Sequence, residues 1–165
     1  MLAMIIVVFA VLLRILPHPW NFAPVGAIAL FGGAHFRRRW AAIVLPLAAM
    51  LAGDAVIGFH RLMPVIYATY ALIAVLGMLL RHRRHSIAAV GAGSLAASAI
   101  FYIVTNFAVW ATGTMYAKSI AGLGACYVAA IPFFGNTLLS DALYTAIFFG
   151  LYALAERGAP EPASW

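Results

Sequence analysis

The 165-residue sequence predicts an all-α integral membrane protein, a bundle of six transmembrane helices in one domain. Three observations predict this class. The chain is 66% hydrophobic and has a mean hydropathy of +1.03. Only 8% of its residues are charged, whereas soluble domains carry about 25%. Finally, long apolar runs recur along the chain, and basic residues cluster between them.

Six apolar segments are expected to cross the membrane, because a helix needs about 20 residues, and at least roughly 17, to span a core of about 30 Å. They lie at 1–16, 23–36, 40–58, 63–80, 87–112 and 136–155. Pro17 ends the first segment, which lacks the basic region and cleavage site of a signal peptide. Pro24 suits the first turn of the second segment. The helices form one membrane domain over residues 1–157, and residues 158–165 form a short cytoplasmic tail.

The stretch 119–131 is expected to be a separate element. It lies between Lys118 and Pro132, consists of small and apolar residues, and is too short to cross a membrane. The sequence therefore predicts a re-entrant or interfacial segment between the fifth and sixth helices.

Basic residues fall mostly on one side of this topology. One side holds Arg37, Arg38, Arg39, Arg81, Arg83, Arg84 and Arg157, and the other holds Arg14, Arg61 and Lys118. Because cytoplasmic loops are enriched in lysine and arginine, we expect a multi-pass protein of the inner (cytoplasmic) membrane with both termini in the cytoplasm. The formal net charge of +6 is thus a topology signal and predicts no nucleic-acid partner.

The rare polar side chains gather on the outer side. The candidate binding residues are His18, Asn21, Asp54, His60, Arg61, Tyr67, Tyr102, Asn106, Trp110, Tyr116, Asn136 and Asp141. Several recur every four residues and so share a helix face, as do Ser94, Ser98, Tyr102 and Asn106, and Thr137, Asp141 and Thr145. Serines and threonines at this spacing also serve helix packing.

Asp54 and Asp141 carry the strongest functional signal. An aspartate at the centre of a membrane helix costs about 2.5–3.5 kcal/mol on insertion scales, so such carboxylates usually face cavities or partners. Each also has a structural interpretation. Asp54 could pair with Arg61, and Asp141 could complement the dipole at the N-terminus of its own helix.

No permanent metal site, cofactor or catalytic residue is expected. His18, His60 and Cys126 lack the close spacing of zinc ligands, and a single cysteine excludes a disulfide scaffold. The chain has no P-loop, GxSxG or HExxH motif. These residues predict the binding and movement of a small molecule rather than an enzyme.

Several blocks resemble a bacterial family of uncharacterised transport proteins, over residues 12–152. The blocks are Pro17–Ala27 with Phe31–Ala34, Gly53–Asp54 with Gly58–His60, Thr105–Trp110, and Tyr127–Thr137. More distantly, the chain is similar to the substrate-binding S components of energy-coupling-factor (ECF) vitamin transporters, including the solitary vitamin B12 type.

That resemblance implies an outer vitamin pocket built by loops 17–22, 59–63 and 113–135. It also implies a partner, an ECF-type ATPase and coupling module, that drives inward movement through the membrane lipid. Cobalamin is the leading substrate, with His18, His60 or Cys126 as the ligand of its cobalt. Two alternatives stay open: a membrane enzyme that modifies a lipid or cofactor with Asp54, His60 and Asp141, and a non-transporting assembly subunit.

Overall fold

The computed structural model describes residues 21–158, without the side chain of Ile57. These residues form five α-helices and one 3-10 helix, with no strand among them. The elements are α2 (Val25–His35), α3 (Arg39–Ile57), α4 (Met63–Leu79), η1 (Arg81–Arg83), α5 (Ile87–Thr112) and α6 (Ile120–Arg157). The all-α prediction is confirmed for this part of the chain. The expected span 1–16, His18, and residues 159–165 of the expected tail lie outside it.

Local sequence signals explain where several helices begin and end. Ser86 precedes α5, and its hydroxyl accepts a hydrogen bond from the Ala89 N–H at 3.3 Å. Ser119 precedes α6 and accepts one from the Gly122 N–H at 3.1 Å. Such serine caps satisfy amides that have no partner inside the helix. At the end of α3, Gly58 has φ 115°, a conformation that L side chains rarely adopt.

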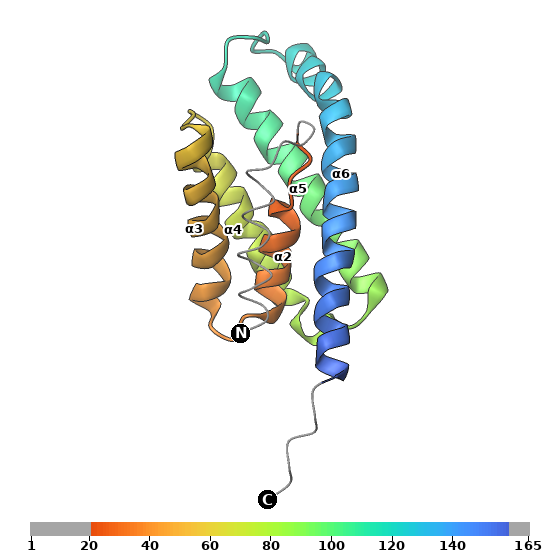
Figure 1. Cartoon of the computed structure of the whole chain (residues 1–165). Coiled ribbons are helices and arrows are strands. Elements are labelled where there is room, and N and C mark those ends of the chain that lie inside the picture. Colours follow the sequence, from red (N-terminus) through yellow and green to blue (C-terminus); the bar gives the residue numbers. More distant parts are fainter. Residues whose placement is uncertain (1–20, 159–165) are drawn as a thin grey trace, which may run out of the picture.

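Successive helices run in opposite directions, so their connections collect at two ends of the bundle (Figure 1). The loop end, at the top of the view, holds residues 21–24, 58–62 and 113–119. The basic end, at the bottom, holds residues 36–38, residues 80–86 and the C-terminus of α6. Loops that were expected to lie outside and the expected cytoplasmic arginine clusters are therefore at opposite ends.

Helix α2 is the centre of the bundle. It contacts α3, α4, α5 and α6, and ten of its eleven residues are buried. It crosses α4 at backbone distance, because Gly33 and Gly77 face each other there. A Cβ atom on Gly33 would overlap the Ala74 carbonyl oxygen, and one on Gly77 would overlap that of Leu30.

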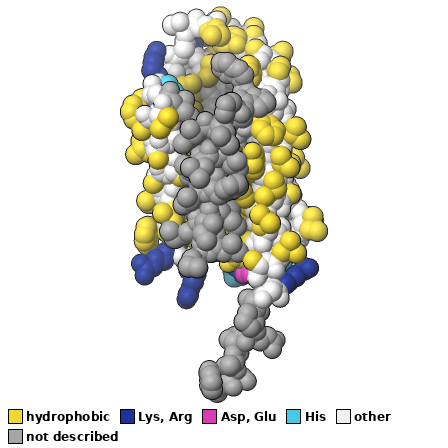
Figure 2. Space-filling model, in the orientation of Figure 1, with side chains coloured by type: hydrophobic (Ala, Val, Ile, Leu, Met, Phe, Trp, Pro, Cys, Tyr) yellow, Lys and Arg dark blue, Asp and Glu magenta, His cyan; other side chains and the backbone are white. Residues whose placement is uncertain are grey.

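Among the described helices, three are long and apolar enough to cross a membrane: Arg39–Val56 of α3, α5 and α6. Helices α2 and α4 are apolar but shorter, with 11 and 17 residues. Many large hydrophobic side chains are exposed, among them Leu51, Leu95 and Leu139. Hydrophobic side chains cover both flanks of the face shown in Figure 2. Apolar surface on this scale marks a contact with lipid or protein. The described residues therefore support a helical membrane protein with three membrane-length helices, and they do not support six spans.

The predicted re-entrant segment at 119–131 was wrong. These residues are the first third of α6, a continuous helix of 38 residues with Pro132 inside it. At 1.5 Å per residue this helix is about 57 Å long, well beyond the roughly 30 Å of a hydrocarbon core. Proline removes only one backbone donor, so in apolar surroundings continuing the helix satisfies more backbone groups than ending it. The expected sixth span, 136–155, lies within the rest of the same helix.

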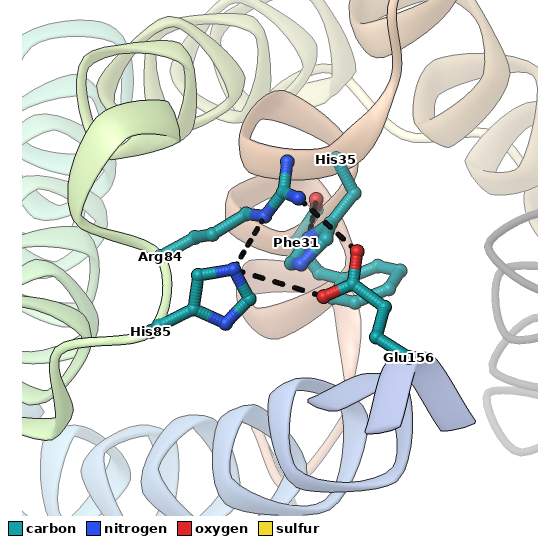
Figure 3. A network of polar contacts seen from close by, with 5 residues as sticks. All are labelled: Phe31, His35, Arg84, His85 and Glu156. Atoms are coloured by element: carbon teal, nitrogen blue, oxygen red, sulfur yellow. Dashed lines mark hydrogen bonds and ion pairs between the residues drawn. The ribbon is translucent and has the colours of Figure 1, made fainter. Parts of the chain in front are cut away.

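Side chains from η1 and the residues after it tie the helices together at the basic end. Arg81 donates from Nε to the Gly33 carbonyl at 3.0 Å and from Nη2 to the Phe36 carbonyl at 2.5 Å, which caps the C-terminus of α2. Nearby, Arg84 pairs with Glu156 of α6 at 3.1 Å, and His85 lies 3.7 Å from the same carboxylate (Figure 3). The His35 ring packs on Phe31 and bonds its carbonyl at 3.0 Å.

These two sets of contacts predict very different mutational effects. Arg81→Ala is expected to cost about 2 kcal/mol, because it removes two charge-assisted bonds and leaves carbonyls of a buried helix without donors. Glu156→Gln is expected to change stability by less than about 1 kcal/mol, since its ion pair is partly exposed. Thermal unfolding of both purified variants in the same detergent checks this. An equal loss in the two variants would contradict the capping role of Arg81.

Candidate functional site

A cavity with two adjoining lobes lies at the loop end. The first lobe has a volume of about 210 Å³ and the second about 180 Å³. The first is lined by Asn21, Ala23, Val25, Asp54, His60, Ile66, Tyr70, Phe101, Thr137 and Asp141. The second is lined by Asn21, Ile66, Phe101, Tyr102, Thr105, Asn106, Val109, Ala130, Phe133, Phe134 and Thr137. The lobes share four residues, so they are parts of one site between the start of α2 and helices α3 to α6.

Asp141 joins the first lobe to the N-terminus of α2. The carboxylate is 3% exposed, accepts the Ser98 hydroxyl at 2.6 Å, and is bonded to the backbone N–H of Ala27. It lies so close to α2 that a Cβ atom on Gly26 would overlap it. Next to it, the Ser140 hydroxyl donates to the Ala23 carbonyl at 3.0 Å. Asp141 thus caps a helix to which it does not belong.

The expected structural role of Asp141, at the N-terminus of its own helix, was wrong. Asp141 lies far inside α6, since that helix begins at Ile120, so it does not complement the dipole of its own helix. It complements the dipole of α2 instead, where Ala27 supplies one of the amides that an α-helix leaves without an internal partner.

Asp54, near the end of α3, forms another polar contact of the first lobe. Its carboxylate is 2% exposed and accepts the Tyr67 hydroxyl of α4 at 2.5 Å. The alternative Asp54–Arg61 ion pair does not form; Arg61 is exposed in the 58–62 loop. His60 of the same loop is exposed and lines the lobe, and its backbone N–H contacts the Met63 sulfur at 3.3 Å. Asp54 and Tyr67 therefore join α3 to α4 beside the cavity.

The second lobe is more aromatic, and its polar groups are engaged with backbone. The Tyr102 hydroxyl donates to the Tyr127 carbonyl at 2.6 Å, and its ring lies 4.5 Å from that of Phe134. Asn106 donates from Nδ2 to the Tyr102 carbonyl at 2.8 Å, which leaves its side-chain oxygen as an acceptor. Cys126 is buried, and its thiol contacts the Asn106 carbonyl at 3.5 Å outside the cavity lining.

The 113–119 loop is closed by its own contacts. Trp110 donates from Nε1 to the Ala117 carbonyl at 2.9 Å. Lys118 donates to the carbonyls of Trp110 and Gly113, and its Nζ lies 5.5 Å from the centre of the Trp110 ring. Trp110 and Lys118 thus hold the α5–α6 connection in place.

The structure brings together half of the predicted binding residues. Six line the cavity: Asn21, Asp54, His60, Tyr102, Asn106 and Asp141. Arg61, Tyr67, Trp110, Tyr116 and Asn136 do not line it, and His18 lies outside the described residues. Within the part of the chain that the structure describes, no three His, Cys, Asp or Glu side chains are grouped as they would be around a metal ion.

Comparison with known proteins gives a family and no activity. Residues 1–162 match the model of a family of unknown function, DUF6580. The chain belongs to this family. No curated protein and no solved structure matches it.

Most of the residues that line the cavity in this DUF6580 chain were not among the predicted binding residues. Phe101, Phe133 and Phe134 are apolar residues in apolar helices, and nothing in their spacing separates a cavity wall from a lipid-facing or core position. Thr137 offered a signal, since it shares the helical row of Asp141, but threonines at that spacing also serve packing. It lines both lobes.

Proposed function

We propose that the chain is a membrane transport protein that binds a vitamin-sized molecule at its loop end and carries it toward its basic end. In this role it would act like the S component of an ECF transporter. The observation that carries the proposal is a cavity at the end opposite the arginine clusters, lined by polar and aromatic side chains from four helices and two loops. Small-molecule sites are typically such concave, largely apolar cavities with a few placed polar groups.

The cavity volume favours a compact substrate over cobalamin. Ligand pockets usually measure about 300–1,000 Å³, and the two lobes together lie near the lower limit. A corrin ring with its nucleotide arm is much larger than a lobe. Of the expected cobalt ligands, His60 lines the cavity, whereas Cys126 does not. We therefore propose a molecule with one or two small rings.

Orientation and partner belong to the same proposal. Because basic loops stay in the cytoplasm, the basic end would face inward in a bacterial inner membrane, and the cavity would open to the outside. An ECF-type module would drive the net movement of substrate, or the chain would transport it without a partner.

An enzyme is the second candidate, because Asp54, His60 and Asp141 all line the first lobe. Carboxylates and an imidazole in one cavity are the groups that general acid–base chemistry uses. The two candidates differ in one observable: a transported ligand leaves chemically unchanged, whereas a substrate of the enzyme does not.

Native mass spectrometry of the full chain, extracted gently from its own membrane, tests the proposal. We expect a retained small molecule in addition to lipid. Thr137→Phe should abolish its retention by filling the wall shared by both lobes. Leu139→Phe, two residues along α6 at an exposed position, should retain it. Wild-type protein without any retained molecule, or equal retention in both variants, would contradict the cavity as the binding site.

A further inference from the structure

The charge of Asp141 has no counter-charge in the described part of the chain. Its partners are the Ser98 hydroxyl and the Ala27 N–H, and no lysine or arginine there forms an ion pair with it. Hydrogen bonds and a helix N-terminus supply only partial positive charge. A buried carboxylate in a membrane-length helix is costly without a full counter-ion, and such groups commonly face one.

The remaining surface of the first lobe is suited to a cation. Its described lining includes the Asp141 carboxylate, whose described partners carry no full positive charge. Tyr70 and Phe101 also line this lobe and pack on each other, with ring centres 5.2 Å apart. Aromatic faces attract an ammonium or a heteroaromatic cation, and a carboxylate strengthens the hydrogen bonds of a charged N–H donor.

The second lobe is suited to a flat apolar group. Tyr102 and Phe134 pack on each other there, with ring centres 4.5 Å apart and planes tilted by 31°, and Phe133 adds a third ring. The side-chain oxygen of Asn106 offers a hydrogen-bond acceptor at this wall. Both lobes meet at Phe101 and Thr137, so one molecule can occupy the two.

We propose that the ligand of this cavity is an organic cation, with a positively charged nitrogen against Asp141 and a flat ring in the second lobe. The proposal rests on the proposed function, since it names the substrate class of the same cavity. An anionic substrate would place two like charges together in a site of low dielectric constant.

Charge-selective thiol labelling tests this in the full chain. Cys126 is replaced by serine and Thr137→Cys is introduced, so that one thiol faces both lobes. Its rates are measured with methanethiosulfonates carrying an ethylammonium, an ethylsulfonate or a methyl group. Each rate is divided by the rate at which the same reagent reacts with 2-mercaptoethanol in solution. We expect a cation-to-anion ratio above about 10, as Coulomb attraction over several ångströms would give.

Variants at Asp141 separate its charge from its shape. Asp141→Asn in this background should lower the ratio several-fold, whereas Asp141→Glu should retain it. Protection should follow the same order: 2-phenylethylammonium should slow labelling by the methyl reagent, and 3-phenylpropanoate at equal concentration should not. The cation-to-anion ratio and the protection are also measured in the protein that keeps Asp141. The proposal can therefore be tested even if an Asp141 variant misfolds.

The outcomes distinguish the two proposals. A cation-to-anion ratio near 1 with normal methyl labelling would overturn the cationic ligand and leave the cavity in place. Failure of all three reagents at Thr137→Cys, with normal labelling of a Thr114→Cys control in the exposed 113–119 loop, would contradict an open cavity at this end. That result would overturn the proposed function itself.

Discussion

Replacing Gly33 with alanine is expected to destabilise the bundle by about 3 kcal/mol and to lower the Tm by roughly 10 °C. The reason is the backbone contact between α2 and α4. A Cβ atom at Gly33 would overlap the Ala74 carbonyl oxygen and lie 2.9 Å from the Gly77 Cα and the Met78 nitrogen. All three are backbone atoms of a packed helix, so the helices must separate, and the core around Phe31 separates with them.

Gly150→Ala is the matched control for this prediction. Gly150 lies in α6 with open space where a Cβ atom would lie, so alanine there should be neutral or stabilising by about 0.5–1 kcal/mol. Thermal unfolding of the two variants in the same detergent measures the difference. A Gly33→Ala protein as stable as the control would show that α2 and α4 do not meet as described.

Replacing Asp141 with leucine is expected to cost about 3 kcal/mol or more. The substitution leaves the Ala27 N–H and the Ser98 hydroxyl buried without an acceptor, each at about 1–3 kcal/mol, and presses a branched side chain against Gly26. Asp141→Asn keeps one acceptor oxygen and should cost about half as much. Hydrogen exchange should rise over the 21–35 segment in the leucine variant, because the first turn of α2 loses its cap.

Thr145→Val is the control for Asp141. Thr145 lies one turn farther along α6 and is equally buried, but among residues 21–158 its hydroxyl finds no hydrogen-bond partner. Valine has nearly the same shape and removes an unsatisfied polar atom, so this variant should be as stable as the wild type or slightly more so. If Thr145→Val lost as much stability as Asp141→Leu, steric packing and not the cap would explain the effect.

Hydrophobic run length predicted the helices well where a strong breaker follows. The expected 87–112 coincides with α5, and 40–58 lies within one residue of α3 at each end. Prediction failed at Pro132, which was taken as a boundary although a helix in apolar surroundings continues through it. The length of the hydrophobic run also overestimated the helix in the 23–36 segment, where only the eleven residues of α2 are helical. The buried position of α2 was not predicted, because it depends on contacts with every other described helix.

For the candidate site, the sequence allowed the polar residues to be predicted but not the apolar residues that line the cavity. Asp54 and Asp141 stand out because charges are rare in an apolar chain, and both line the first lobe. Trp110 and Tyr67 also carry polar groups in this apolar chain, but these groups bond to a loop carbonyl and to Asp54. Whether a polar group faces a cavity depends on the packing of several helices, and a single helical pattern does not contain that information.

The two caps of α2 also impose an order on biosynthesis. Its C-terminus is closed by Arg81, which is 48 residues beyond Gly33, and its N-terminal segment is closed by residues of α6, with Ser140 lying 117 residues beyond Ala23. Eleven residues are too few to cross a bilayer unaided. When α2 leaves the ribosome, the residues that cap its two ends have not yet left it. Helix α2 can therefore reach its final place only after α6 has been made. In this sense the innermost helix, although early in the chain, is among the last to be assembled.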